Sequence, residues 1–270
     1  MAKLYLVGTP IGNLGDITLR AIDTLKMVDV IACEDTRHSI GLLNYYDIKS
    51  KLIACHKFNE KESIDKIESF LKEDKNVALI TDAGMPAISD PGAILVDGLI
   101  SRGYEVEVVP GPTAVTSAIA LSGILTPVFT FVGFMPTKNR ERDELISSFK
   151  KVKTALVIYS SPYDINKDLA YLYKVLGNRV VYVVKELTKI HESSIKMNLE
   201  DAQINDPKGE YVLIVDKGED VEEAPTMSIE EQLKELIQAG VDKKEAIKKV
   251  AKSNKLLKDD VYKIALDLNL

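Results

Sequence analysis

The chain of 270 residues has only two cysteines and three histidines, and it has no long apolar run. Because no stretch of 18 apolar residues occurs, we expect no membrane-spanning helix. Cys33 and Cys55 lie in short apolar runs, which favours small buried residues, with a disulfide as an open alternative. His38, His56 and His191 are scattered, and neither a CxxC nor an HExxH pattern is present, so we expect no bound metal.

The overall composition is that of a folded globular protein. Hydrophobic residues make up 46% of the chain and charged residues 28%, which excludes wholesale disorder. The formal net charge of −6 excludes a uniformly basic nucleic-acid coat, so any RNA contact must come from a local basic patch. The first residues lack the apolar region and cleavage site of a signal peptide, and we expect a cytoplasmic protein.

Strand-like and helix-like segments alternate over residues 1–120, which predicts an α/β domain with a largely parallel sheet. Thr18 and Thr113 are placed to cap helices, and Asp90 is a further expected N-cap with Pro91 at the first helical position. The strands expected here are residues 4–7, 28–33, 51–55, 77–81 and 105–109.

Residues 121–218 predict a second α/β domain, joined to the first by a hinge near 120–127. A helix is expected at 165–175, ended by Gly177. The last two strands are expected to form an antiparallel pair. The strands expected in this domain are residues 128–132, 155–159, 180–184, 192–197 and 210–215.

The end of the chain has a different character. Residues 218–226 are acidic and contain a proline, which is typical of a linker. Ser228 and Glu231 have the spacing of a capping box, and Gly240 is expected to end the helix that they begin. Two further helical patterns follow, so residues 226–270 predict a small bundle similar to a helix-turn-helix.

Three loops that follow predicted strands carry the pattern of a ligand site, because open α/β sheets bind ligands at the carboxyl ends of their strands. Residues 8–18 and 110–114 are rich in glycine and proline, and each is equally well explained as a tight connection. Residues 81–92 are longer than a plain connection requires, and Asp82 is placed to accept hydrogen bonds from a ligand. Arginine and lysine are absent from the second and third of these loops, which favours a small ligand with a purine and few or no phosphates.

Several long motifs occur in a fixed order. They are GTPIGNLGDITLRA from Gly8, EDTR from Glu34, LITDAGMPAISDPG from Leu79, VVPGPTAVTSAIALSG from Val108, GFMP from Gly133 and KELTKIHE from Lys185. Over residues 3–217 this set resembles the ribosomal RNA small subunit methyltransferase I family, which has the tetrapyrrole-methylase fold.

The resemblance implies two α/β domains with a cleft between them, followed by a small C-terminal helical bundle. It implies that S-adenosylmethionine lies in the cleft and that its methyl group goes to the 2′-hydroxyl of a cytidine in the decoding region of small-subunit (16S) ribosomal RNA. The implied partners are the small ribosomal subunit and a second copy of the chain, without metal or membrane. The residues that match the family's cofactor contacts are Pro10, Ile11, Asp82, Ala83, Gly84, Met85, Pro86, Thr113, Ala114, Tyr159, Lys185 and Gly209.

Two other functions stay open. One is methyl transfer from the same cofactor to a tetrapyrrole or a protein side chain. The other is a binding protein without catalysis, which is suggested by a departure from the family pattern. Where the family commonly has ESPHR, residues 160–164 read SSPYD, so a carboxylate, an imidazole and a guanidinium are replaced.

A ribose hydroxyl is a poor nucleophile, so a base or a neighbouring cation is expected to assist the transfer. The candidates are Lys185, Glu186 and Arg37, and each has a simpler interpretation. The first two suit a solvated strand end, and Arg37 suits an ion pair with Asp35 or Glu34.

RNA contact requires local positive charge. One candidate patch is Lys138, Arg140 and Arg142. Residues 240–258 form the other, with seven lysines against two acidic residues. Solvation is the usual role of such a helix face, but a basic helical bundle suits RNA phosphates at least as well. The lysines expected to contact RNA are Lys244, Lys248, Lys249 and Lys252.

Overall fold

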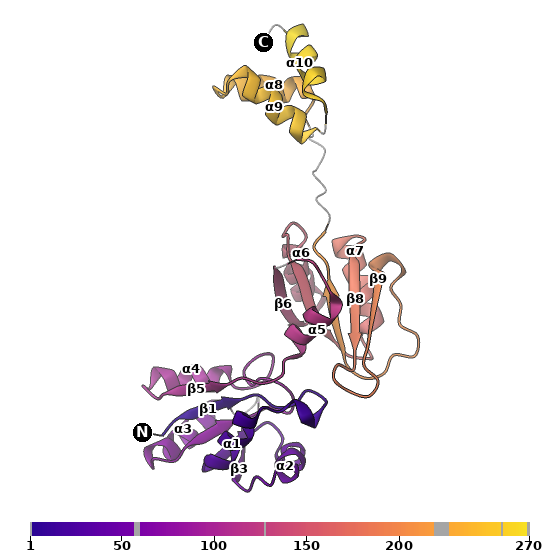
Figure 1. Cartoon of the computed structure of the whole chain (residues 1–270). Coiled ribbons are helices and arrows are strands. Elements are labelled where there is room, and N and C mark those ends of the chain that lie inside the picture. The colour runs from indigo at the N-terminus through magenta and orange to yellow at the C-terminus, as the bar shows by residue number, and fades with distance from the viewer. Residues whose placement is uncertain (1, 57–59, 127, 219–226, 255, 269–270) are drawn as a thin grey trace. The chain divides into compact units, whose positions relative to one another are not determined.

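The computed structural model describes residues 2–56, 60–126, 128–218, 227–254 and 256–268. The chain separates into two compact units, Met1–Lys217 and Gly218–Leu270 (Figure 1). Within the described residues, the first unit contains two five-stranded sheets, and the second contains three helices. The predicted linker falls largely on residues 219–226, which lie outside the described residues, as does Pro127 of the predicted hinge.

The first sheet is entirely parallel, as the alternation of strands and helices predicts, and its strand order is β3-β2-β4-β1-β5. Helices cover both of its faces. Ile67 and Leu99 fill the core on one face, and Leu25 and Leu43 fill the core on the other. The strands are β1 Leu4–Val7, β2 Val30–Cys33, β3 Lys51–Ala54, β4 Val77–Leu79 and β5 Val106–Val109; the helices are α1 Leu19–Met27, α2 Thr36–Tyr45, α3 Glu60–Lys72 and α4 Ala93–Ser101, with a short 3-10 helix at Leu14–Asp16.

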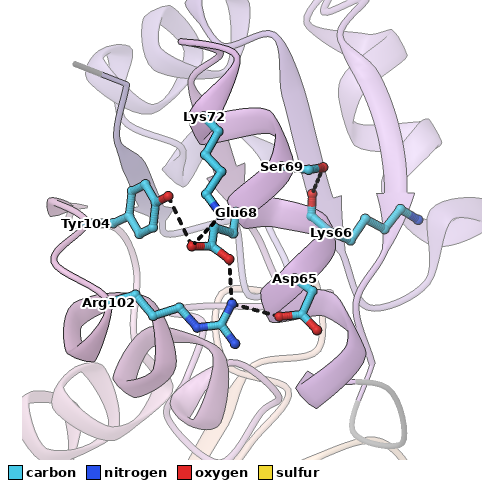
Figure 2. Close-up of polar contacts among 7 residues, drawn as sticks. All are labelled: Asp65, Lys66, Glu68, Ser69, Lys72, Arg102 and Tyr104. Atoms are coloured by element: carbon cyan, nitrogen blue, oxygen red, sulfur yellow. Dashed lines mark hydrogen bonds and ion pairs between the residues drawn. The ribbon is translucent and has the colours of Figure 1, made fainter.

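A polar network joins α3 to the end of α4 (Figure 2). One Arg102 guanidinium nitrogen lies 2.7 Å from a carboxylate oxygen of Asp65 and 2.7 Å from one of Glu68. The Glu68 carboxylate also lies 3.1 Å from Lys72 Nζ and accepts a hydrogen bond of 3.2 Å from the Tyr104 hydroxyl. These contacts fix α3 beside α4, and this matters because α3 supplies the cap of α4.

The start of α4 corrects one prediction. The N-cap residue is Gly92, with φ of 133°, and it is not Asp90. The buried Glu60 carboxylate of α3 accepts hydrogen bonds from the backbone N–H groups of Gly92 (3.1 Å) and Ile94 (3.2 Å). Because a side chain distant in sequence satisfies the N–H groups at the start of this helix, the Asp90 carboxylate is not needed there. The caps expected at Thr18 and Thr113 are confirmed.

The second sheet is mixed, with strand order β6-β7-β10-β8-β9 and only the β6–β7 pair parallel. The expectation that its last two strands pair is wrong, because β8 lies between β10 and β9. The strands are β6 Phe129–Phe134, β7 Ala155–Ser160, β8 Val180–Lys185, β9 Ser193–Asn198 and β10 Tyr211–Val215; the helices are α5 Ala114–Ser122, α6 Asn139–Ser148 and α7 Ile165–Leu176, with a short 3-10 helix at Leu199–Asp201.

Most of helix α5 falls within the predicted first domain, 1–120, but its buried residues pack on the second sheet. Val115 and Ala118 share a core with Val184 and Val212 of the second sheet. Helices α6 and α7 cover the opposite face of that sheet. The small side chains of α5 therefore allow close packing on the second sheet. The division at residue 120 stays a prediction.

The unit Gly218–Leu270 contains α8 Ile229–Gln238, α9 Lys243–Ser253 and α10 Lys258–Asp267. Its core is formed by Leu233, Ile247, Val250 and Val261. The predicted capping box is confirmed, because Ser228 and the Glu231 carboxylate each accept a hydrogen bond from the other residue's backbone N–H group. The predicted C-terminal helices are therefore present and share one core.

Cys33 and Cys55 are both free and buried, so the disulfide alternative is wrong. None of the helices in the described part of the chain has the length and apolar character that a membrane span requires. Among the same residues, no cluster of three or more histidine, cysteine or acidic side chains is arranged to hold a metal.

Candidate active site

A cavity of about 660 Å³ is lined by residues from the loops after β1, β4 and β5 and by residues of the second sheet. Its volume lies in the range of small-molecule sites. The lining residues are Ile11, Ala83, Gly84, Met85, Ile88, Asp90, Thr113, Ala114, Val115, Thr116, Phe129, Phe131, Phe134, Tyr159, Ser160, Ser161, Pro162, Val184, Leu187, Glu210, Tyr211 and Val212.

The loops after β1 and β4 are joined by their backbones. Thr9 N–H donates to Gly84 O at 2.9 Å, and Gly84 N–H donates to Thr9 O at 3.2 Å. The buried Thr9 hydroxyl also donates to Thr81 O at 3.1 Å. A side chain at Gly84, whose φ is +85°, would bring its Cβ to 3.3 Å from Ile11 Cγ2. Glycine at this position therefore keeps the two loops close along one wall of the cavity.

Most of the residues predicted to contact a cofactor lie in this lining, although their role in binding stays a prediction. Pro10, Pro86 and Gly209 are outside the lining and adjoin residues that are in it or hold it. Asp82 also lies outside, next to Ala83. The predicted residues found in the lining are Ile11, Ala83, Gly84, Met85, Thr113, Ala114 and Tyr159.

The cavity suits a cationic ligand with an apolar, flat part. Its described lining contains two carboxylates, Asp90 and Glu210, and no lysine or arginine. Such a lining favours a sulfonium or ammonium group over a polyphosphate. The buried Asp82 Oδ1 atom has no hydrogen-bond partner among the residues that the structure describes, so a ligand donor that reached it would remove the cost of an unsatisfied acceptor. These features fit the S-adenosylmethionine that the sequence resemblance implies.

The three catalytic candidates lie outside this cavity. Side chains alternate along β8, and because Val184 faces the cavity, Lys185 faces the other side of the sheet. There it lines a second, smaller cavity of about 290 Å³ together with Val183. The Lys185 placement therefore favours neither of its predicted roles, in catalysis or in cofactor contact.

Glu186 and Arg37 have partners of their own. The Glu186 carboxylate lies 3.0 Å from Lys189 Nζ and accepts a hydrogen bond of 2.9 Å from Glu210 N–H. A Cβ atom at Gly209 would lie 2.5 Å from the same carboxylate carbon, so this glycine and Glu186 hold the backbone before Glu210. Arg37 is 93% exposed and lies 3.5 Å from Asp35, in agreement with its simpler interpretation as an ion-pair partner.

Phe129, Phe131, Phe134 and Tyr159 form one side of the cavity, here called the aromatic wall. The Tyr159 ring makes edge-on contacts with the rings of Phe131 and Phe134, and the distances between ring centroids are 5.0 Å and 5.5 Å. Phe134 shares the face of Phe129 and Phe131 because the β6 register shifts between Phe131 and Gly133. The sequence reasoning missed the phenylalanines, although the spacing of two between Phe129 and Phe131 along a strand was a usable signal.

Helix α7 supplies a carboxylate next to residue 160, where the family's ESPHR pattern has a glutamate and this chain has a serine. The hydroxyl of Ser160, which lines the cavity, donates a hydrogen bond of 2.6 Å to the Asp168 carboxylate. Both residues are buried, with exposed fractions of 3% and 7%. A carboxylate therefore lies beside position 160 even though residue 160 is a serine. Burial raises the pKa of Asp168, and the Ser160 hydrogen bond opposes this shift.

Replacing Ser160 with alanine is expected to lower the free energy of unfolding by about 1–3 kcal/mol, because a buried carboxylate loses its hydrogen-bond donor. Chemical denaturation at pH 7 measures the change. Ser161→Ala is the matched control, since Ser161 pairs with Asp164 at the surface and its loss is expected to cost about 0.5 kcal/mol or less. Equal stabilities of the two variants would show that the Ser160–Asp168 contact contributes nothing.

Asp90 is the most perturbed acid of the lining. Burial raises its pKa to about 6, and the negative charges of Glu34 and Asp82 add to the shift, whereas a hydrogen bond from Thr81 opposes it. Burial also raises the pKa of Tyr159 to about 12, with a further contribution from the Asp90 charge. The cavity thus contains a carboxyl group that titrates near neutrality beside a phenol that stays protonated.

The raised pKa of Asp90 has a consequence for stability. The folded protein holds the proton more tightly than the unfolded chain does, so stability falls as the pH rises from about 4 to about 6. Asp90→Asn removes this effect, and we expect the variant to melt at a higher temperature than the wild type at pH 7 but not at pH 4. Asp97→Asn, at an exposed position of α4, is expected to leave both melting temperatures unchanged. A variant that melted lower at pH 7 would contradict this prediction.

The predicted RNA-binding side chains differ in how far their charge is compensated. Lys138 pairs with Glu141 at 2.9 Å, and Arg140 pairs with Glu144 at 2.8 Å. Arg142 lies over the Tyr171 ring, with its guanidinium carbon 4.2 Å from the ring centroid. This patch on α6 is therefore largely neutralised or packed.

On α9, Lys249 lies 3.3 Å from Glu245. Lys244, Lys248 and Lys252 are exposed, and within the described residues no ion pair involves them. Lys255, which was counted in the basic segment, lies outside the described residues. The uncompensated positive charge of the two patches is therefore on α9.

Comparison with known proteins identifies the family. Residues 3–203 match the family model of Tetrapyrrole (Corrin/Porphyrin) Methylases. Proteins named Ribosomal RNA small subunit methyltransferase I are similar over most of the chain. The one from Halalkalibacterium halodurans is 41% identical, and the match covers 97% of this chain and 93% of that protein. The one from Thermotoga maritima is 44% identical, covering 80% of this chain and 98% of that protein.

Solved structures share the fold at much lower identity. The methyltransferase CobJ superposes with a TM-score of 0.62 at 16% identity, covering 81% of this chain and 95% of CobJ. Uroporphyrin-III C-methyl transferase from Thermus thermophilus, in complex with S-adenosyl homocysteine, has a TM-score of 0.57 at 19% identity, covering 80% of this chain and 97% of that one. From these matches, the chain belongs to the tetrapyrrole methylases and, within them, to the ribosomal RNA small subunit methyltransferase I family of S-adenosylmethionine-dependent enzymes.

Proposed function

We propose that this chain transfers a methyl group from S-adenosylmethionine to the 2′-hydroxyl of a cytidine in the decoding region of small-subunit (16S) ribosomal RNA. The observation that carries the proposal is the 660 Å³ cavity, which combines carboxylates, an aromatic wall and no described basic side chain. The relatives named Ribosomal RNA small subunit methyltransferase I support ribosomal RNA as the substrate.

When bound, S-adenosylmethionine supplies a methyl group that the sulfonium already activates, so no metal is required. The chain's own contribution is to hold donor and acceptor in line. Ile11, Gly84 and Met85 on one side, with Thr113 and Ala114 on another, would contact the cofactor. The aromatic wall offers apolar surface on which a nucleobase can stack.

We extend the proposal to partners and location. The assembled small ribosomal subunit is the proposed substrate, with α9 contributing contacts to RNA phosphates. The active form is proposed to be a homodimer in the cytoplasm. Sedimentation of the full chain tests the dimer, since a monomeric mass at micromolar concentration would contradict it.

A labelling experiment tests the proposed reaction. The full chain is incubated with methyl-labelled cofactor and, in separate reactions, with small ribosomal subunits, naked small-subunit RNA, a free tetrapyrrole and an elongation factor. We expect label in the subunits. Label in the tetrapyrrole or the protein alone would support the alternative acceptors instead, and no label anywhere would support a binding protein.

A variant pair shows whether the label depends on the cavity. Met85→Lys places a cation in the lining and is expected to abolish labelling, because it repels the sulfonium. Met27→Lys is the matched control, since Met27 is half exposed and lies outside the lining. Undiminished labelling by the Met85 variant would show that the reaction occurs elsewhere.

A further inference from the structure

Asp90 lines the cavity because tertiary contacts place it there, and not because it caps α4. The Glu60 carboxylate satisfies the first N–H groups of α4, so the Asp90 side chain is left to line the cavity. Two non-glycine residues just before it, Ala87 and Ser89, have φ values of 67° and 65°. Such left-handed backbone costs free energy at non-glycine residues and is concentrated at functional sites.

Charged and titratable groups reach Asp90 from several elements. Glu34 follows β2, Asp82 follows β4 and Tyr159 lies on β7. The charges of Glu34 and Asp82 disfavour a third negative charge on Asp90, and the high pKa of the phenol keeps Tyr159 neutral. Asp90 is therefore an acid that is mostly ionised at pH 7 yet able to hold a proton, as a general base must be.

Three other polar groups of the cavity already have partners. The Ser160 hydroxyl donates to Asp168, and the Glu210 carboxylate lies 2.8 Å from Lys189 Nζ. The Tyr211 hydroxyl accepts a hydrogen bond of 3.1 Å from Lys208 N–H. Lys185, Glu186 and Arg37 are outside the lining. Of the two carboxyl groups in the described lining, Asp90 is half-buried and makes no ion pair with a described residue, so it has capacity for a substrate proton.

We propose that Asp90 is the general base that removes the proton from the acceptor hydroxyl. The inference rests on the proposed function. The hydroxyl oxygen forms a bond to the methyl carbon while the bond from that carbon to sulfur breaks, leaving its electron pair on the sulfur. The hydroxyl proton passes to an Asp90 carboxylate oxygen and then to water. The sulfonium charge is lost in the same step, so charge balances.

The test compares Asp90→Asn with Asp97→Asn in the full chain, using single-turnover methyl transfer at saturating cofactor from pH 5 to pH 9. The wild type and the Asp97 variant should lose rate below about pH 6. The Asp90 variant should be slower by about 10²–10⁴-fold and lack this acid limb, with cofactor affinity within a few-fold of the wild type by calorimetry. Asp90→Glu should restore part of the rate.

A second readout does not depend on activity. In protein labelled with ¹³C at the aspartate carboxyl carbons, one resonance should titrate near pH 6, and Asp90→Asn should remove it. An Asp90 variant that kept more than a tenth of the wild-type rate with the same acid limb would overturn the proposal. So would a loss explained wholly by weaker cofactor binding. Failure of the wild type itself to methylate RNA would instead overturn the proposed function.

Discussion

Replacing Gly111 with alanine is expected to weaken S-adenosylmethionine binding by roughly tenfold or more. The new Cβ would lie 2.9 Å from three backbone atoms of Gly8, where the loops after β1 and β5 touch. We expect the two loops to move apart, which would shift Ile11 away from Thr113 and Ala114 in the cavity lining. Overpacking of this kind costs about 1–3 kcal/mol, and about 1.4 kcal/mol corresponds to a tenfold change in affinity.

Calorimetric titration of the folded variants measures this effect. Gly41→Ala is the matched control, because Gly41 is an exposed residue of α2 and its Cβ would meet open space. Alanine also favours a helix over glycine, so this control should be as stable as the wild type or more so. Unchanged affinity in Gly111→Ala would show that the Gly8–Gly111 contact does not shape the cofactor site.

The second large effect is expected on α9. Changing Lys244, Lys248 and Lys252 together to glutamine should weaken binding to small ribosomal subunits and make it less dependent on salt. The slope of log K against log salt is negative, and removing one lysine–phosphate interaction reduces its magnitude by about 0.7–0.9. The magnitude for the triple variant should therefore be smaller by about 2–3. Glutamine has nearly the helix propensity of lysine, so α9 should remain folded.

The control for this experiment is the triple variant Lys49→Gln, Lys75→Gln and Lys208→Gln. Those lysines lie in the first unit, and each pairs with a nearby carboxylate. Cofactor affinity should be unchanged in both triple variants. If the α9 variant binds small ribosomal subunits as tightly as the wild type at every salt concentration, the α9 lysines only face solvent and do not contact RNA.

Residual activity of the α9 variant is also expected. No residue of α9 is in the described lining of the cavity, so the α9 lysines should affect RNA affinity more than the rate of the bound complex.

Local signals predicted the parallel sheet, the caps at Thr18 and Thr113 and the loops at the cavity, because these depend on residues close in sequence. Asp90 shows where that reasoning fails. Asp-Pro-Gly before an apolar segment is a good helix start by sequence alone, and nothing near it reveals that Glu60, 30 residues earlier, makes the cap.

Lys185 shows a second limit. Its place after an apolar strand suggested a site residue, but the face to which a strand residue points depends on register and on which face the partner elements cover. The structure places Val184 in the cavity and Lys185 opposite. The packing of α5 on the second sheet could not be predicted from the sequence either, because its small residues suit close contact with either sheet.

The most direct test of the proposed reaction is the chemical position of the transferred methyl group. Small-subunit RNA labelled by the full chain is hydrolysed with alkali, which cleaves only next to a free 2′-hydroxyl. We expect the label in an alkali-resistant dinucleotide whose 5′ residue is 2′-O-methylcytidine. Label recovered in mononucleotides with a methylated base would contradict ribose methylation and, with it, the role of Asp90.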